Sequence, residues 1–301
     1  DRACNTTWQP ALEAPRRALL QLYERTYGPN HPATARPLLS LLCHFAYNGK
    51  TSEGRAENEQ IIARLVAIGR KRAQPATLFA ALTAQAGLRR EQEKPDVAIA
   101  DATEALALAR RHFADYPAIV ASSAGALAAT FEAAGRPVDA EPLRQEAVTL
   151  IQTMPDVNRL ALVDVYEALG NNLTAQLRAK DAASWFSREL DIFEAILSTA
   201  NANDLSNIIL YSQRLYGADP PRVEALYRAV LARQEADPAS SDKRNWMTLW
   251  NLAKSTSLER GWKNNGFRSD LSEAIAYQRR VIAAMGPGQG NSFELELASL
   301  L

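Results

Sequence analysis

Histidine and cysteine are the residue types of this chain best suited to metal or nucleophilic chemistry, and both are rare. The sequence holds three histidines and two cysteines. His31, His44 and His112 are far apart, and no second histidine or cysteine stands at a metal-ligand spacing from any of them. Neither Cys4 nor Cys43 has the local sequence of a catalytic nucleophile, and no Gly-x-Ser-x-Gly motif occurs. We therefore predict no metal site, no catalytic residue and no cofactor.

A phosphate-binding loop is the other chemistry that a short pattern could indicate. Residues 286–290 read Gly-Pro-Gly-Gln-Gly. No strand pattern precedes them, and their glycine spacing fits neither a phosphate-binding loop nor a dinucleotide-binding fingerprint. Basic clusters at residues 70–72 and 110–111 close helical runs, where cations suit the negative end of the helix dipole, and we interpret them as solvated caps. The sequence predicts a protein that is not an enzyme.

The charge balance argues against two large classes of partner. Lysine and arginine together number 34, as do aspartate and glutamate. A balanced chain lacks the basic surface that binds nucleic acids and anionic membranes. No apolar run approaches the length that crosses a bilayer. We expect neither nucleic-acid binding nor membrane insertion.

The first ten residues leave two questions open. The chain begins at Asp1 with a short polar segment that looks like a mature N-terminus, which favours a periplasmic or secreted protein over a cytoplasmic one without settling the compartment. Cys4 could fold back and pair with Cys43 in an oxidising compartment, but two cysteines without a framework spacing are more often free thiols. Both states remain open.

A small residue recurs along the chain at a fixed interval. Five alanines follow one another at intervals of 42 residues, and the series continues with a valine 41 residues on and an alanine 51 residues further. We call these residues the marks: Ala14, Ala56, Ala98, Ala140, Ala182, Val223 and Ala274. Repetition at a period of about 20–50 residues indicates stacked helical repeats, each burying its apolar face on its neighbours. We expect the marks at contacts between helices.

Residues 117–154 contain the clearest copy of the repeat. Pro117 opens an apolar helical run, Gly135 breaks it, and residues 139–143 begin a second run that ends near Ile151. Apolar residues recur at steps of three and four, which predicts a hairpin of two amphipathic helices at 118–134 and 138–153. The same pattern predicts a lone second-type helix at 11–26 and hairpins at 33–48 with 52–70, 76–92 with 96–113, 157–178 with 181–199, 203–215 with 220–235, and 243–262 with 270–284.

These residues resemble the tetratricopeptide repeat in the longer, 42-residue form seen in kinesin light chains and in many bacterial proteins. The likeness rests on Pro117, Gly135 and residues 139–143, on the run Val-Glu-Ala-Leu-Tyr-Arg-Ala at 223–229, and on residues 23–28 leading to His31 and Pro32. The resemblance implies an all-α fold, a right-handed α-solenoid of tandem helix-turn-helix hairpins. It also implies a protein that binds other proteins or peptides.

We expect the repeats to form one domain. The predicted parts are a lead segment at residues 1–10, a single repeat array at 11–285, and a glycine-rich turn with a capping or truncated helix at 286–301. The apolar residues of that last helix lack a hairpin partner, and an unpaired apolar face seeks cover. End-to-end self-association is therefore a further expectation.

The resemblance also implies where a ligand would bind. In such repeats the first helix of each hairpin lines the concave face, and an asparagine about two turns along that helix holds the backbone of a bound peptide. The corresponding positions here are Ser40, Thr83, Ala126, Ala168, Asn207 and Asn251. Asn172 lies one turn beyond Ala168 and would point the same way. The N-terminal half departs from the asparagine pattern and would contribute shape.

Aromatic and basic residues accompany the last of these positions. Trp246, Trp250 and Lys254 recur at steps of four along one predicted helix. They could form an aromatic and basic wall of the groove, or the tryptophans could pack in the core against the final helix. The predicted peptide-binding residues are Asn172, Asn207, Trp250, Asn251 and Lys254.

We interpret the chain as a non-enzymatic scaffold or adaptor whose concave surface binds another protein or an extended peptide. Two alternatives remain open. The array could be the sensor or regulatory half of a longer enzyme, for example a protease, whose catalytic domain follows residue 301. It could also be a structural, self-assembling spacer.

Overall fold

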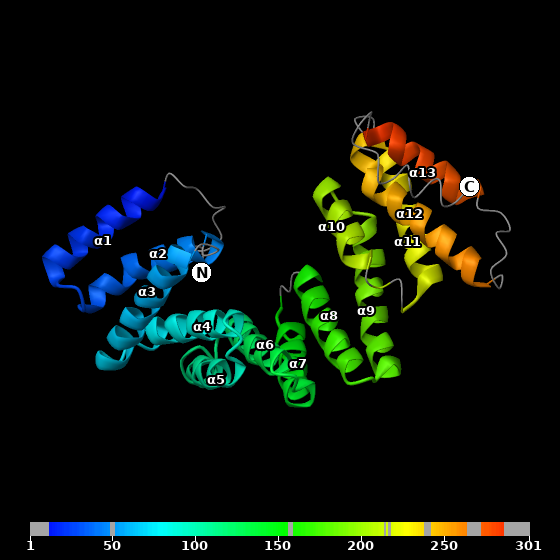
Figure 1. Ribbon diagram of the computed structural model, residues 1–301. Helices are drawn as coiled ribbons and strands as arrows, with labels where there is room; N and C mark the ends of the chain where they lie inside the picture. Colours follow the sequence, from blue (N-terminus) through cyan, green and yellow to red (C-terminus); the bar gives the residue numbers. More distant parts are fainter. Residues whose placement is uncertain are drawn as a thin grey trace. The chain divides into compact units, whose positions relative to one another are not determined.

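The computed structural model describes residues 12–48, 52–155, 159–213, 215, 218–237, 242–263 and 272–285. Within these ranges the chain consists of α-helices and short 3-10 turns, and no strand occurs there. The chain divides into two compact units, residues 1–161 and 162–301 (Figure 1). The single array at 11–285 stays a prediction. The last predicted helix, Cys4 and the side chain of Cys43 lie outside the described parts.

In the first unit each helix packs against the next one in the chain. Its helices are α1 (Glu13–Tyr27), α2 (Ala35–Asn48), α3 (Ser52–Lys71), α4 (Pro75–Glu91), α5 (Pro95–His112), α6 (Pro117–Ala133) and α7 (Pro137–Gln152), with a 3-10 helix at Pro32–Thr34. Helices α2, α4 and α6 are the first helices of hairpins, and α3, α5 and α7 are the second helices. The observed α6 and α7 agree with the predicted bounds within one residue.

The second unit continues the same alternation. Its helices are α8 (Arg159–Ala175), which begins three residues before the unit boundary, α9 (Ala179–Leu197), α10 (Ala202–Ser212), α11 (Pro220–Glu235), α12 (Asp242–Lys263) and α13 (Ser272–Met285). Tyr166 of α8 and Trp185 of α9 bring their ring centroids to 5.5 Å. Helix α12 packs against both α11 and α13. The predicted all-α fold of tandem hairpins is confirmed.

Proline marks the starts of helices in both positions of the hairpin. A proline has no backbone N–H, and the first residues of a helix need none, so proline is well tolerated there. The first residues of helices α4, α5, α6, α7 and α11 are Pro75, Pro95, Pro117, Pro137 and Pro220. At these five helices proline marks where the chain re-enters a helix after a turn.

The turns inside three hairpins share one backbone geometry. Glu93, Gly135 and Leu177 stand 42 residues apart and have positive φ angles of 57°, 72° and 64°. After each of them, the next N–H donates to the carbonyl five residues earlier, as in Arg136 N to Phe131 O at 2.9 Å. This left-handed closure satisfies a free carbonyl at the helix end. Glycine adopts it without strain, whereas Leu177 does not.

Most of the marks lie where helices touch. Ala98 and Ala140 are 0% exposed, and Ala182 is 1% exposed. The two later marks, Val223 and Ala274, are buried as well. A small side chain at these positions lets the second helix approach its neighbours closely, as the repeat pattern predicts.

The predicted register is wrong for the first two marks, because Ala14 and Ala56 are exposed. In α3 the buried position that matches Ala102 of α5 is Ile62, which stands 40 residues earlier and not 42. The connections differ: three residues join α3 to α4, with Ala73 at a φ of 49°, whereas four residues join α5 to α6. The shorter turn accounts for one residue of this two-residue shift in the buried face of α3. The spacing of the alanines in the sequence does not reveal this shift of the buried face.

Arginine–carboxylate pairs link successive second helices within each unit. The nitrogen–oxygen distances are 2.5 to 2.7 Å in Arg17–Glu57, Arg64–Glu24, Arg70–Glu104, Arg110–Glu146, Arg222–Glu194, Arg228–Glu273 and Arg280–Glu235. The basic clusters interpreted as solvated caps therefore supply Arg70 and Arg110 to the following repeat. Partly exposed pairs of this kind contribute about 0–1 kcal/mol each.

We expect the buried marks to tolerate no larger side chain. Ala98→Leu and Ala140→Leu should each lower the free energy of unfolding by about 1–3 kcal/mol, because both positions are fully buried and overpacking forces neighbours apart. Ala56→Leu, at an exposed mark, should change it by less than about 0.5 kcal/mol. Urea unfolding followed by circular dichroism measures all three. Parent-like unfolding of both buried variants would place the marks outside the helix contacts.

The left-handed turns predict opposite changes in stability for two substitutions, one that introduces a glycine and one that removes a glycine. Leu177→Gly should stabilise the second unit by up to about 1 kcal/mol, because it removes left-handed strain from a side chain that is 93% exposed. Gly135→Leu should destabilise the first unit by about 1–2 kcal/mol through backbone conformation alone, since a Cβ at Gly135 would meet no atom within 4 Å. Thermal unfolding of both variants would contradict this account if the two shifts had the same sign.

Candidate functional site

Two of the three asparagines predicted to capture a peptide are buried. Asn172 in α8 is 2% exposed, and its Oδ1 accepts a hydrogen bond of 2.8 Å from Gln176 Nε2. Asn251 in α12 is 8% exposed, and its Nδ2 donates to the carbonyl of Met247 at 2.8 Å. Asn207 in α10 is half-buried. Of the three, Asn207 therefore presents its side chain most openly to solvent.

Trp250 and Lys254 lie together on α12. The Lys254 ammonium is 4.5 Å from the centroid of the Trp250 ring, within the range of a cation–π contact. Trp250 is half-buried, Trp246 is half-buried as well, and Lys254 is exposed. The pair offers a flat aromatic surface beside a positive charge. Its role in binding a peptide stays a prediction.

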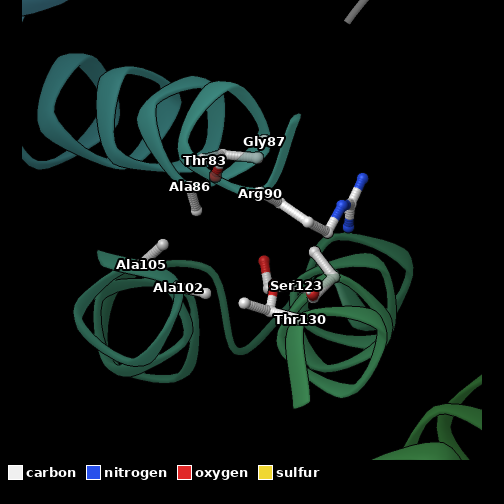
Figure 2. A pocket seen from close by; sticks show the side chains of 9 residues that line it. Thr83, Ala86, Gly87, Arg90, Ala102, Ala105, Ser123 and Thr130 are labelled. Carbon is white, nitrogen blue, oxygen red and sulfur yellow. Dashed lines mark hydrogen bonds between the residues drawn. The ribbon is translucent and has the colours of Figure 1, made fainter. Parts of the chain in front are cut away.

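A cavity in the first unit was not predicted from the sequence. It has a volume of about 160 Å³ and lies between α4, α5 and α6 (Figure 2). The residues that line it are Thr83, Ala86, Gly87, Arg90, Ala102, Ala105, Ser123, Ala126 and Thr130. Figure 2 shows Ala86 of α4 and Ala105 of α5 pointing toward each other across this space, which we call the α4–α6 pocket.

Helical periodicity brings these residues to one place. Thr83, Gly87 and Arg90 recur at steps of four and three on α4, and Ser123, Ala126 and Thr130 recur at steps of three and four on α6. Because α4 and α6 are the first helices of neighbouring hairpins, their facing stripes border the same space. Two positions that sequence reasoning assigned to the inner face, Thr83 and Ala126, both line the pocket. Equivalent positions of successive first helices therefore do meet a common cavity here.

Three hydroxyl groups give the pocket its polar character. Thr83 Oγ1 donates to the carbonyl of Phe79 at 2.9 Å, Ser123 Oγ to that of Ile119 at 2.9 Å, and Thr130 Oγ1 to that of Ala126 at 2.8 Å. Each hydroxyl hydrogen is thus used within its own helix. The oxygens keep lone pairs that can accept hydrogen bonds from a ligand.

Arg90 is the one charged side chain among the nine lining residues. It is exposed, and it forms no ion pair with any residue in the described part of the chain. The neighbouring Arg89 pairs instead with Asp101 of α5. Burial raises the pKa of Asp101 above its ordinary value, and the Arg89 guanidinium opposes this rise. The charge of Asp101 is therefore matched by Arg89, and that of Arg90 is not matched.

The sequence does contain a signal for this pocket. No charged residue occurs from 75 to 88 in α4 or from 117 to 131 in α6. Surface helices normally carry charge on their solvent face, so two long uncharged helices suggest a shared, partly enclosed space. No short motif marks the pocket, because its residues come from three helices.

Within the described residues, no cluster of three histidine, cysteine, aspartate or glutamate residues is placed to hold a metal ion. None of the described helices is both long and apolar enough to span a membrane. The α4–α6 pocket combines hydrogen-bond acceptors, small apolar side chains and one guanidinium. Such an arrangement is suited to binding a polar chain segment.

Comparisons with known proteins bear on the fold. No family model matches the sequence, and no curated protein matches it. Among solved structures, BtubC (BKLC) from P. vanneervenii is similar at 15% identity and a TM-score of 0.52, covering 76% of this chain and 89% of that one. The putative kinesin light chain of Podosopora anserina with nearly identical TPR-like repeats is similar at 16% identity and a TM-score of 0.51, covering 70% and 96%. At these identities the likeness concerns the fold alone.

Proposed function

The chain has the fold of kinesin-light-chain-like tetratricopeptide repeats, and we propose that it is a non-enzymatic scaffold that binds an extended peptide segment of another protein. The observation that carries this proposal is the α4–α6 pocket. It lies between the first helices of neighbouring hairpins, and its lining is small, uncharged and rich in acceptor oxygens, with a single arginine.

Small side chains suit the approach of a peptide backbone. An extended segment exposes an N–H and a carbonyl at every residue, and these groups need partners when they leave water. The oxygens of Thr83, Ser123 and Thr130 can accept from such N–H groups. Ala86, Ala102 and Ala105 leave room for the backbone to come close. Binding of this kind reads little of the peptide's sequence.

We propose a second contact surface in the second unit, made of the residues predicted from the sequence. Asn207 is half-buried and can donate to and accept from a peptide backbone, while Trp250 and Lys254 offer an aromatic and cationic anchor. Asn172 and Asn251 would support this surface from below, since both are buried. A hydrogen bond contributes about 0.5–1.5 kcal/mol net, so the anchor would supply much of the affinity.

One observation favours a second candidate function, that of a self-assembling spacer. The first helix, α1, contains no fully buried residue and exposes Leu19, Leu22 and Tyr27 by 42%, 52% and 52%. Exposed apolar side chains gathered on one helix can pack against another copy of the chain. The spacer therefore remains the alternative to a peptide-binding scaffold.

Selection from a phage-displayed library of random short peptides tests the scaffold proposal. We expect enrichment of peptides that bind the full chain, and Asn207→Ala combined with Lys254→Ala should weaken selected binders of the second unit by about tenfold in fluorescence anisotropy. The matched control is Asn203→Ala combined with Lys180→Ala, at exposed positions of α10 and α9. Failure to enrich any peptide would refute the scaffold, and equal binding by both double variants would refute the second-unit surface.

The spacer makes a separate prediction. Sedimentation velocity of the parent chain should show association that grows with concentration, and Leu22→Lys should abolish it because the charge cannot be buried without a partner. Leu210→Lys, at a position 55% exposed in α10, serves as the control and should associate like the parent. A parent chain that stays monomeric at high concentration contradicts the spacer.

A further inference from the structure

We propose that five exposed cations at the turns between hairpins of the first unit bind the anionic headgroups of a lipid bilayer. They are Arg25, Arg36, Lys71, Arg72 and Arg111, and we call this set the basic edge. The contact is peripheral and leaves every helix outside the bilayer core. It is independent of peptide binding. The balanced total charge of the chain gave no reason to expect such a surface, because a total does not say where the charges lie.

Charge is distributed unevenly between the two kinds of turn in the first unit. Each turn is taken here from the last three residues of one α-helix to the first three of the next. The turns between hairpins, residues 25–37, 69–77 and 110–119, together contain seven arginines and lysines and one acidic residue. The described turns within hairpins, residues 89–97 and 131–139, contain four basic and five acidic residues. Positive charge is therefore concentrated at the turns between hairpins.

Contacts between neighbouring repeats bring the three basic turns together. Arg64 of α3 donates to the carbonyl of Pro29 at 3.0 Å, which places the α1–α2 turn beside the C-terminal half of α3. Phe79, near the start of α4, and Phe113, directly after α5, bring their ring centroids to 5.4 Å. Because short turns reverse the chain from each helix to the next, the turns between hairpins lie at one edge and the turns within hairpins at the other.

The cations of the basic edge form no ion pair within the described part of the chain. Two further arginines of these turns, Arg70 and Arg110, are paired with carboxylates of the following second helix. The one acidic residue of the three turns, Asp115, is exposed and balances a single charge at most. Like charges without counter-charges repel one another, so an anionic partner would stabilise the set.

Helix capping alone does not account for these cations. A basic residue suits the negative end of a helix. However, α7 has no basic residue in its last turn, whereas α3 has Arg70 and Lys71 there and Arg72 directly after it. Arg36 lies at the start of α2, where the helix dipole disfavours a cation. The helices of this unit can thus end without such a cluster, and its concentration at one edge favours a role in binding.

Two tyrosines accompany the basic edge. Tyr27 at the end of α1 is 52% exposed, and Tyr116 directly before α6 is 61% exposed. A tyrosine has an apolar ring and a polar tip, and it is favoured where lipid headgroups meet acyl chains. Arginine and lysine beside such a boundary interact with anionic headgroups. The basic edge and the two tyrosines therefore offer both contacts that a bilayer surface provides.

A bilayer fits the basic edge better than a nucleic acid does. Domains that bind nucleic acids are usually basic as a whole, and this chain has equal numbers of basic and acidic residues. A flat surface meets the turns at one edge and stays clear of the acidic turns at the other. Aromatic residues that stack on bases follow one another along a groove, whereas Tyr27 and Tyr116 belong to separate turns.

Co-sedimentation of the full chain with vesicles tests the proposal. The probes are vesicles of phosphatidylcholine alone and vesicles that also contain about 30% phosphatidylglycerol. We expect binding to the anionic vesicles alone. Raising the salt from about 0.1 M to about 1 M should release the protein, because the Debye length falls from about 10 Å to about 3 Å. Binding that is equal for both kinds of vesicle, or that resists salt, would overturn the electrostatic contact.

A pair of double variants locates the contact. Arg72→Gln combined with Arg111→Gln should weaken binding to the anionic vesicles about thirtyfold, since each cation near such a surface contributes about fivefold. The matched control is Lys94→Gln combined with Arg136→Gln, which removes two exposed cations from the turns within hairpins. The control should bind as the parent does. Equal binding by the two double variants would overturn the basic edge.

Substitutions of Tyr116 test the aromatic contact. Tyr116→Ala should weaken binding to the anionic vesicles severalfold, and Tyr116→Trp should retain it, because tryptophan is favoured at the same depth of the bilayer. Val138→Ala, at a position 67% exposed in a turn within a hairpin, is the control and should bind as the parent does. Unchanged binding of Tyr116→Ala would overturn the aromatic part of the contact.

A short DNA duplex is the competing probe, and its binding is followed by fluorescence anisotropy. Tighter binding of the duplex than of the anionic vesicles, weakened by the Arg72 and Arg111 double variant, would overturn the lipid surface in favour of a nucleic acid. Absence of binding to the anionic vesicles at about 0.1 M salt would overturn the proposal outright. Neither result bears on peptide binding, which the library selection tests separately.

Discussion

Close approach between neighbouring helices is the constraint on which the rest of this structure depends. A Cβ at Gly69 would lie 2.8 Å from the Cβ of Leu78, and one at Gly170 would collide with the ring of Phe186. Ala98 and Ala140 fill the corresponding role with a single methyl group and are fully buried. Because a packed interior does not yield by more than a few tenths of an ångström, these small residues fix how each helix sits on the next. Each unit then builds outward from these contacts.

In the first unit the second helices of the hairpins carry the ion pairs, and the first helices carry long stretches of uncharged residues. The second helices α1, α3, α5 and α7 carry the arginine–carboxylate pairs that link one repeat to the next, such as Arg70–Glu104 and Arg110–Glu146. The first helices α4 and α6 contain long uncharged stretches and face the pocket. The charged residues of α4 and α6 lie in the last turns of these helices, and Arg90 is exposed there.

Sequence reasoning recovered the hairpins because they depend on local signals. Pro117, Gly135 and the steps of three and four set the ends and faces of α6 and α7 within one residue. The buried face of α3 was not predicted correctly, because it depends in part on the left-handed turn at Ala73. No glycine stands at this position to indicate such a turn. The burial of Asn172 and Asn251 was missed as well, since it depends on the distance between helices and not on their spacing in sequence. The pocket draws on three helices, and no single stretch of sequence reports it.

The repeat fold separates positions that hold the helices together from positions that are free to differ. The marks must stay small wherever they are buried, whereas equivalent inner positions carry Thr83, Ala126 and Asn207 in different hairpins. Under the proposed function, this freedom suits each unit to a different feature of a peptide: acceptor oxygens and small side chains in the first unit, and Asn207 with the Trp250–Lys254 pair in the second.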